Sequence, residues 1–119
     1  MKSVALLLAL LVAGCASAPP PLTEGDDGRT LAAAPGTVLE VRLAENGSTG
    51  YSWAADSSDE RLVLVETRHE APSGPPGRGG TVLFRYRVAA PGPSRLALKY
   101  WRSWEGDRSV VRRFAVTIN

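Results

Sequence analysis

Apolar and polar residues alternate along most of the chain beyond residue 30. Between residues 39 and 43, Leu, Val and Leu are separated by Glu and Arg, and the same period of two returns at 82–88, 95–100 and 113–118. Such a period places apolar side chains on one face of a strand and polar side chains on the other, as in antiparallel sheets with one face in water. Beyond the first 13 residues, no stretch has the period of a helix.

Three further segments complete the predicted set of strands. A short apolar run lies at 62–65, and weaker strand patterns lie at 29–33 and 51–54. Seven short strands in roughly 90 residues, separated by turns rich in Pro, Gly, Asn and Asp, predict an all-β fold, an immunoglobulin-like antiparallel β-sandwich. In this arrangement Trp53, on the third strand, is the buried tryptophan of the core.

The connections between the strands differ from one end of this sandwich to the other. In an immunoglobulin-like fold the second, fourth and sixth connections share one end. Here they are residues 46–50, 73–80 and 102–106, which we call the first, second and third loops. They carry glycines, small hydroxyls and Trp104, whereas the other three connections have ordinary turn residues. Because function on such scaffolds usually resides in loops held by rigid strands, we expect a binding surface at this end.

The N-terminal segment is typical of export and membrane attachment. Residues 1–14 combine a positive start with an apolar run of about ten residues, too short to span a bilayer as a helix. The run leads into Leu-Val-Ala-Gly-Cys at 11–15, which resembles the lipobox of bacterial lipoproteins. The resemblance implies that residues 1–14 are a signal peptide and that Cys15 is lipidated. An ordinary signal peptide, cleaved after Ala16 or Ala18, is the alternative.

Residues 15–28 predict a flexible tether between the lipid and a folded domain at 29–119. The Pro19–Pro21 run is locally stiff, and the segment has no apolar period. Because the first strand of such a sandwich begins at the end that carries the three loops, we expect the tether to leave beside them. Ala16, rather than Asp, follows the cysteine, so the lipobox resemblance implies a bacterial cell-envelope protein anchored in the outer membrane and facing the periplasm.

Composition narrows the class of function. The chain has 119 residues, enough for one domain, and its formal net charge of +2 is too weak to indicate nucleic-acid binding. One Cys and one His rule out a disulfide framework, offer no set of metal ligands and leave little for nucleophilic catalysis. We interpret His69 as a surface residue. We therefore expect a monomeric binding module with no metal, no cofactor and no catalytic residues.

The first loop has an ordinary interpretation as well as a functional one. Asn46-Gly47 is a common hairpin turn. However, Ser48, Thr49 and Gly50 exceed what a two-residue turn needs and suit a loop that lies close to another backbone.

The second and third loops also allow two interpretations. The Gly77–Gly80 segment is either a surface loop or part of a binding surface, and no helix follows it to complete a phosphate site. Trp104 either folds over the end of the sandwich or binds a partner. Trp101 is expected to point outward, and two exposed indoles near one loop are costly unless they bind something.

The three loops together resemble a known family. Asn-Gly-Ser-Thr-Gly-Tyr-Ser-Trp at 46–53, Gly-Arg-Gly-Gly at 77–80 and Arg-Ser-Trp-Glu at 102–105 follow one another in that order. They resemble the signature loops of chagasin-type inhibitors of papain-like cysteine peptidases, which are Asn-Pro-Thr-Thr-Gly-Tyr, Gly-x-Gly-Gly and Arg-Pro-Trp. The resemblance covers roughly residues 37–119. Gly47 and Ser103 replace prolines of that pattern, which predicts less rigid loops and weaker binding.

The resemblance implies reversible, non-covalent obstruction of a peptidase cleft. Trp104 would be the main anchor on the rim of the cleft, with Arg102 packed against it or paired with an acidic group of the peptidase. The other interpretations of the chain are a surface-anchored adhesion module and an inhibitor of another class of peptidase. The residues that the resemblance assigns to peptidase binding are Asn46, Gly47, Ser48, Thr49, Gly50, Gly77, Arg78, Gly79, Gly80, Arg102 and Trp104.

Overall fold

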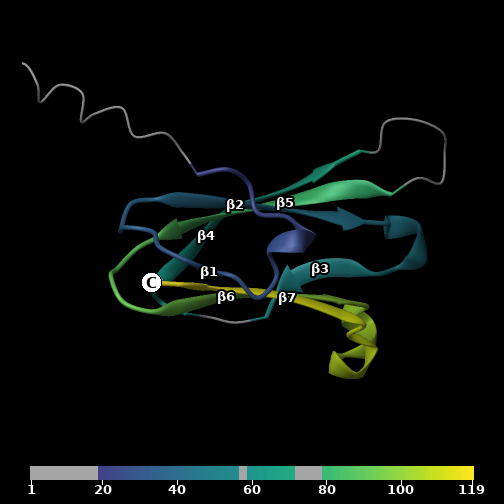
Figure 1. Cartoon of the computed structure of the whole chain (residues 1–119). Coiled ribbons are helices and arrows are strands. Elements are labelled where there is room, and N and C mark those ends of the chain that lie inside the picture. Colours follow the sequence, from purple (N-terminus) through teal and green to yellow (C-terminus); the bar gives the residue numbers. More distant parts are fainter. Residues whose placement is uncertain (1–18, 57–58, 72–78) are drawn as a thin grey trace, which may run out of the picture.

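The computed structural model of the chain describes residues 19–56, 59–71 and 79–119. In this part of the chain, seven strands form two sheets that pack face to face, so the predicted all-β sandwich is confirmed (Figure 1). One sheet has the order β1-β7-β6-β3 and the other the order β2-β5-β4. Neighbouring strands are antiparallel, except that β1 runs parallel to β7. The strands are β1 (Thr30–Leu31), β2 (Val38–Glu45), β3 (Ser52–Ala55), β4 (Leu62–Glu70), β5 (Gly80–Val88), β6 (Ser94–Trp101) and β7 (Arg112–Ile118).

Alternate residues of both sheets form the core between them. Trp53 on β3 is 5% exposed, which confirms its prediction as the core tryptophan. Its indole N–H donates a 3.0 Å hydrogen bond to the carbonyl of Ala44, so the buried polar atom has a partner. The ring of Tyr100 on β6 lies 5.0 Å from the indole, centre to centre. The most deeply buried large side chains are Phe114, Leu43, Leu83, Leu96, Leu98, Ile118, Val41, Val82 and Val116.

Leu83 departs from the expected alternation. The period of two assigns it to the polar, solvent-facing side of β5, yet it is fully buried. Its neighbours in register are Arg42 on β2 and Arg68 on β4. Residues opposite one another in a sheet share a face, so the aliphatic stems of these arginines can cover Leu83 while their charged ends stay in water. Polar residues on both flanking strands can therefore bury an apolar residue on a central strand.

The outer face of the same sheet carries a network of ion pairs. Arg42 and Arg85 both contact Glu40, with nitrogen-to-oxygen distances of 2.6 and 3.3 Å. Arg85 also contacts Glu66 at 3.3 Å. The hydrogen bond from Arg42, followed by that from Arg85, lowers the pKa of Glu40. This face is consequently hydrated and largely self-neutralised.

Residues 19–31, here called the N-terminal strap, connect the edges of the two sheets. Leu22 pairs with β2 beside Val41, donates to the carbonyl of Glu40 and is 5% exposed. Further along the strap, Asp27 accepts a 2.8 Å hydrogen bond from the amide of Ala115 on β7. The segment at 22–28 is therefore packed on the sandwich, whereas the sequence placed it in a flexible tether. An apolar period could not reveal this, because Leu22 is the only large apolar residue of the segment.

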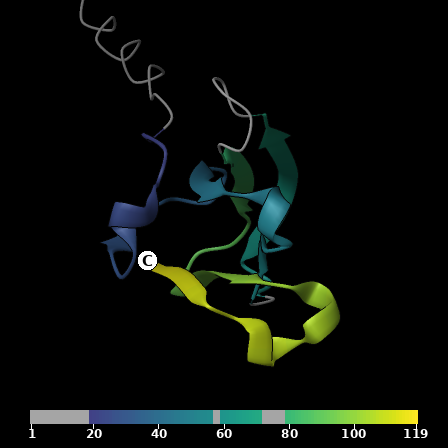
Figure 2. The same cartoon turned by 90° about the vertical axis from the view of Figure 1, so that its right-hand side faces the viewer.

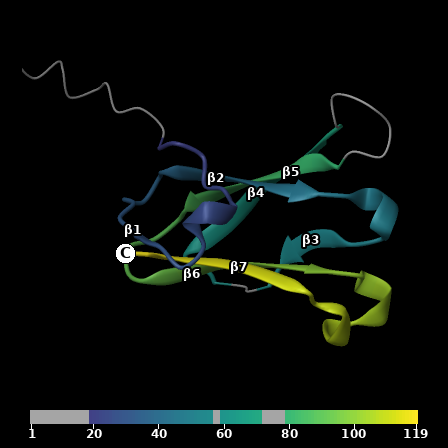
Figure 3. The ribbon, with the colours of Figure 1, turned by 45° about the vertical axis from the view of Figure 1, so that its right-hand side comes forward.

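The strap also corrects the expected exit of the chain. Leu22 runs parallel to β2, so Pro19–Pro21 lie toward the start of that strand, where they line a hollow with Leu39. β1 pairs with the last residues of β7, beside the C-terminus. β1 therefore lies at the end of the sandwich opposite the first and third loops (Figure 3). The expectation that the chain enters beside the loops is wrong for the described residues. Cys15 and residues 1–14 lie outside them.

Helical structure in the described residues is confined to short 3₁₀ turns, one of which, η2 (Glu24–Asp26), lies in the strap. No helix in this part of the chain has the length and hydropathy needed to cross a bilayer.

Candidate functional site

One end of the sandwich gathers residues that are far apart in sequence. The first loop contains the 3₁₀ turn η3 (Gly47–Thr49), and the third contains η4 (Ser103–Glu105), followed by η5 (Asp107–Ser109). Figure 1 shows these turns at the end away from the C-terminus, and Figure 2 looks onto that end. We call this the loop end. The described residues of the three loops share it, as expected from the order of the strands.

The first loop is held mainly by its own side chains. Asn46 caps η3, because its Oδ1 accepts from the amide of Ser48 at 3.2 Å and from the hydroxyl of Ser48 at 2.7 Å. The hydroxyl of Thr49 donates to the carbonyl of Asn46 at 2.7 Å. Gly50 ends the turn at φ 84°, in the left-handed region that favours glycine. The hydroxyls of Ser48 and Thr49, which the sequence suggested as contacts for a partner, therefore make hydrogen bonds that fix the conformation of the loop.

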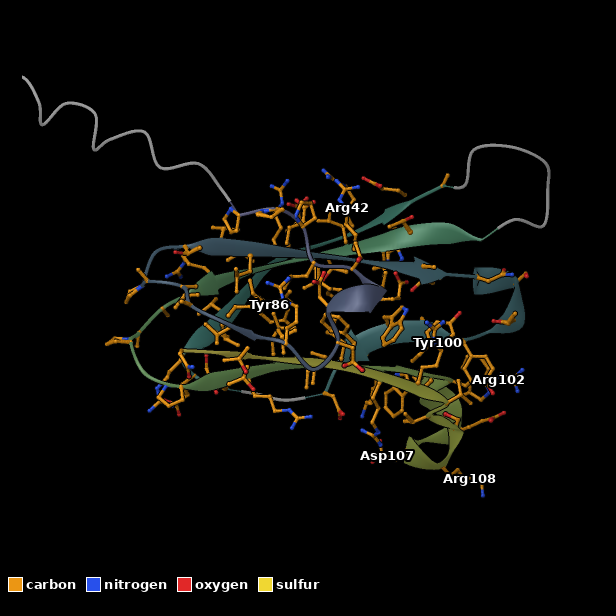
Figure 4. All side chains as sticks on the ribbon, viewed as in Figure 1. Arg42, Tyr86, Tyr100, Arg102, Asp107 and Arg108 are labelled. Carbon is orange, nitrogen blue, oxygen red and sulfur yellow. The ribbon has the colours of Figure 1, made fainter. Side chains whose placement is uncertain are left out.

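The third loop is bound to the first through Arg102. Its Nε and Nη2 donate to the carbonyl of Thr49 at 3.3 and 3.1 Å. The guanidinium carbon lies 4.6 Å from the centre of the Tyr51 ring, and Nη1 lies 3.4 Å from a carboxylate oxygen of Glu105. Figure 4 shows Arg102 at this end of the molecule, beyond Tyr100. The side chain is thus used within the chain, and we interpret it as holding the first and third loops together.

Trp104 lies at the surface of the loop end. It is 69% exposed, the highest value among the large apolar residues described as exposed. One edge of its ring rests on the first loop, because a β-carbon at Gly50 would lie only 3.0 Å from Cη2 of the indole. The residue therefore leans against the first loop without being buried in the sandwich, and most of its surface is available for contact.

Ser109 is a functional candidate that the sequence did not reveal. It is 7% exposed and lies just after the third loop. Its Oγ accepts from the amide of Arg102 at 3.0 Å and lies 2.7 Å from the carbonyl of Gly106, to which it can donate. One hydroxyl thereby joins the two ends of the third loop. A serine in a polar turn carries no sequence signal of such a role.

The second loop is described only at its end. Gly77 and Arg78 lie outside the described residues, whereas Gly79 and Gly80 lie within them. A β-carbon at Gly79 would lie 2.7 Å from the backbone oxygen of Glu45, just before the first loop. Only glycine fits such an approach, so Gly79 brings the second loop against the backbone that leads into the first.

Trp101 was expected to be an exposed indole, but it is half-buried. The ammonium group of Lys99 lies 3.8 Å from its ring centre. Lys99 in turn contacts Asp107 at 3.0 Å and Asp56 at 3.6 Å. Trp101 is covered in part by the chain itself, which leaves Trp104 as the prominent aromatic side chain of the loop end. The described residues contain no group of three or more His, Cys, Asp and Glu side chains that could hold a metal.

Comparison with known proteins agrees with this geometry. Residues 32–118 match the family model described as "Chagasin family peptidase inhibitor I42". The chain belongs to the chagasin family of peptidase inhibitors. It is 33% identical over 101 residues to chagasin of Trypanosoma cruzi, covering 80% of this chain and 92% of that protein. It is 32% identical over 100 residues to amoebiasin-1 of Entamoeba histolytica, covering 82% of this chain and 96% of that protein. As a member of a family of peptidase inhibitors, it is not an enzyme.

Solved structures show the same chagasin-like sandwich. The solution structure of amebosin matches with a TM-score of 0.70 at 31% identity, covering 85% of this chain and 98% of that one. The cysteine protease inhibitor EhICP2 from Entamoeba histolytica matches with a TM-score of 0.74 at 24% identity, covering 82% and 90%. PbICP-C, solved in complex with falcipain-2, matches with a TM-score of 0.60 at 12% identity, covering 87% and 94%. For EhICP2 and PbICP-C, which are 24% and 12% identical to this chain, the similarity is one of fold alone.

Proposed function

We propose that this protein is a reversible, non-covalent inhibitor of papain-like cysteine peptidases and that its loop end occupies the active-site cleft. Membership of the family supports inhibition of a peptidase. The class of peptidase is supported by the fold neighbours, one named as a cysteine protease inhibitor and another bound to falcipain-2. The geometry of the loop end explains how such a protein can obstruct a cleft.

The observation that carries the proposal is an exposed indole beside a narrow loop that is fixed from within. Gly47, Ser48 and Thr49 are all exposed, and none has a bulky side chain. A cysteine peptidase keeps its Cys and His at the bottom of a groove. A thin loop of small residues can reach that depth without a steric clash.

The internal bonds of the first loop account for resistance to cleavage. Peptide hydrolysis needs the scissile carbonyl in a particular orientation toward the attacking thiolate. The hydroxyl of Thr49 donates to the carbonyl of Asn46, and Arg102 donates to the carbonyl of Thr49, so these carbonyls of the loop are held in other hydrogen bonds. The loop can therefore fill the cleft without adopting the geometry of a substrate.

Trp104 supplies a large apolar contact next to this loop. Tryptophan is among the residues that most often dominate the free energy of binding at protein interfaces. Its position beside Gly50 means that it would meet the rim of the groove when the first loop enters. Gly79 and Gly80 place the end of the second loop next to the first, where backbone groups can meet the groove. Gly77 and Arg78 belong to the same proposed surface.

Inhibition of papain by the chain from Pro19 onward tests the proposal. We expect competitive, fully reversible inhibition of papain and no inhibition of thermolysin, a metallopeptidase, in a parallel assay. Inhibition of thermolysin alone would assign the protein to another class of inhibitor. No inhibition of either would favour the adhesion interpretation and would overturn the proposal.

We also propose that Cys15 carries the lipid of a bacterial lipoprotein and that the protein is anchored in the outer membrane, facing the periplasm. The support is the apolar run that ends in Leu-Val-Ala-Gly-Cys, with Ala16 after the cysteine. Growth with a radiolabelled fatty acid tests this. The label should appear in the full-length protein and be absent from the Cys15→Ser variant. Fractionation of the membranes should recover the labelled protein with the outer membrane.

A further inference from the structure

A histidine–glutamate contact lies at the base of the loop end, among residues that the inhibitory surface does not include. Nδ1 of His69 lies 2.7 Å from Oε2 of Glu45. Glu45 is the last residue of β2, directly before the first loop, and its side chain is 11% exposed. His69 lies near the end of β4, the strand that runs toward the second loop, and its side chain is 61% exposed.

The contact crosses the central strand of the sheet. β5 lies between β2 and β4, with Gly80 opposite Glu45 and Val82 opposite His69. Gly80 and Val82 are two residues apart and so share a face of the strand. Because Gly80 has no side chain, nothing on β5 separates the imidazole from the carboxylate at this position.

Glu45 also closes the base of the first loop. Its second oxygen, Oε1, accepts a 3.2 Å hydrogen bond from the amide of Trp53. Trp53 belongs to β3, the strand that leaves the first loop. One carboxylate therefore joins the strand that enters the first loop to the strand that leaves it, and His69 ties that carboxylate to the strand that leads to the second loop.

We propose that His69 is a positioning residue for inhibition, and that its bond to Glu45 fixes the first loop relative to the second. The inference rests on the proposed function, since the surface that it positions is the inhibitory one. Its basis is the chemistry of the two partners. A carboxylate oxygen accepts and an imidazole N–H donates, so the contact is a hydrogen bond in which Nδ1 of His69 donates to Oε2 of Glu45.

The other charged groups near the imidazole have partners of their own. Arg68 and Glu70 flank His69 on β4, where they contact each other, and Glu70 also contacts Arg42. On β5, the nearby described residues Gly80 and Thr81 carry no charge. From β7, Arg112 lines the hollow beside Glu45. Glu45 is therefore the partner that the geometry gives to the imidazole.

The inhibition constant against papain tests the role. In His69→Ala the bond to Glu45 is lost, so the inhibition constant should rise about threefold. In His69→Gln the side-chain amide can still donate to Glu45, so inhibition should return toward that of the wild type. Arg68→Gln is the matched control, because Arg68 lies on the same strand and its described ion pairs are with Glu66 and Glu70, and its inhibition constant should not change. An unchanged inhibition constant for His69→Ala overturns the proposal.

A second measurement does not depend on inhibition. The Trp53 amide donates to the same carboxylate, so its NMR resonance should shift in His69→Ala and return toward its wild-type position in His69→Gln. The absence of a shift in His69→Ala overturns the role of His69. If His69→Ala shows the shift but the wild type does not inhibit papain, the contact stands and the proposed function is rejected instead.

Discussion

The guanidinium of Arg102 donates two hydrogen bonds to the carbonyl of Thr49, from Nη2 at 3.1 Å and Nε at 3.3 Å. These residues are 53 positions apart in the sequence and belong to different sheet connections. The bond holds the third loop against the first, so that an exposed tryptophan and a narrow loop form one surface. The sequence resemblance assigned Arg102 to contact with a peptidase; the structure gives it a role in shaping the surface.

Replacing Arg102 with lysine should weaken inhibition. A lysine ammonium can reach the carbonyl of Thr49, but it cannot also present a planar group to Tyr51 and a second donor to the same oxygen. We expect the inhibition constant to rise about tenfold, equivalent to about 1.4 kcal/mol. The matched control is Arg108→Lys on the neighbouring turn, where no hydrogen bond or ion pair is described for the side chain. Equal inhibition by both variants would contradict the role of Arg102.

Trp104→Ala should raise the inhibition constant tenfold or more while leaving the thermal stability nearly unchanged. The side chain is 69% exposed, so its removal uncovers little of the core, whereas an indole at the centre of an interface contributes strongly to binding. Val111→Ala serves as control, because Val111 is also exposed, at 58%, and lies outside the loops. If Trp104→Ala inhibits as well as the wild type, the indole is not an anchor.

Restoring the family prolines should tighten inhibition. Gly47 and Ser103 are the first residues of η3 and η4, a position that suits proline. The preceding residues, Asn46 and Arg102, already have the extended backbone that proline requires of its neighbour. Each replacement should lower the inhibition constant about two- to fivefold, because the loops lose less entropy on binding, by about 0.4–1 kcal/mol.

The double variant, with both prolines, tests whether the two effects are independent. Titration against papain and thermal melting of all three variants are the measurements. A variant that melts higher but inhibits more weakly would show that the loop must move in order to bind.

Leu22→Ala should destabilise the whole domain, although the sequence placed Leu22 in the tether, ahead of the predicted domain at 29–119. The side chain is 5% exposed and belongs to the core, so truncation should lower the free energy of unfolding by about 2–4 kcal/mol. Denaturant unfolding is the measurement, with Leu64→Ala as control, because Leu64 is 42% exposed. Equal stability of Leu22→Ala and the wild type would show that the strap is detached in solution.

The ion pairs of Glu40 should make stability depend on acid pH. The hydrogen bonds from Arg42 and Arg85 lower the pKa of Glu40, so its contribution is complete above the usual range of a free carboxyl and is lost as the pH falls below about 4. Glu40→Gln should therefore be less stable than the wild type by about 0.5–1 kcal/mol at pH 7, and the difference should shrink at pH 3.

The control for this titration is Glu60→Gln, because no ion pair is described for the exposed Glu60. Denaturant unfolding at both pH values is the measurement. The pKa of Asp26 is lowered first by the amide of Thr23 and that of Asp59 first by the amide of Arg61, so the wild type itself should lose stability over the same acid range. A constant difference between Glu40→Gln and the wild type at all pH values would contradict the assignment.

Much of the fold could be predicted because period-two patterning is a strong local signal. The alternation around Leu39, the core position of Trp53 and the shared end of the loops all follow from it. Where two opposite residues cover a third, the signal fails: Leu83 is buried although its pattern is that of an outward-facing residue.

The parts that escaped prediction depend on contacts distant in sequence. Leu22 stands alone among polar and proline residues, and its pairing requires β2 to be in place already. Ser109 and His69 act through partners at the two ends of a loop or on a different strand. A local sequence pattern cannot show a hydrogen-bond partner that lies on a distant strand or at the other end of a loop. The three loop motifs, in contrast, were specific enough to indicate the family.

The entry of the chain at Pro19, far from η3 and η4, decides how the molecule can be handled and displayed. A group joined directly to Pro19, such as a fluorophore or an agarose bead, is attached on the side remote from Trp104. A peptidase can then approach the immobilised inhibitor from the bulk solution, and no long spacer is needed to expose the inhibitory surface.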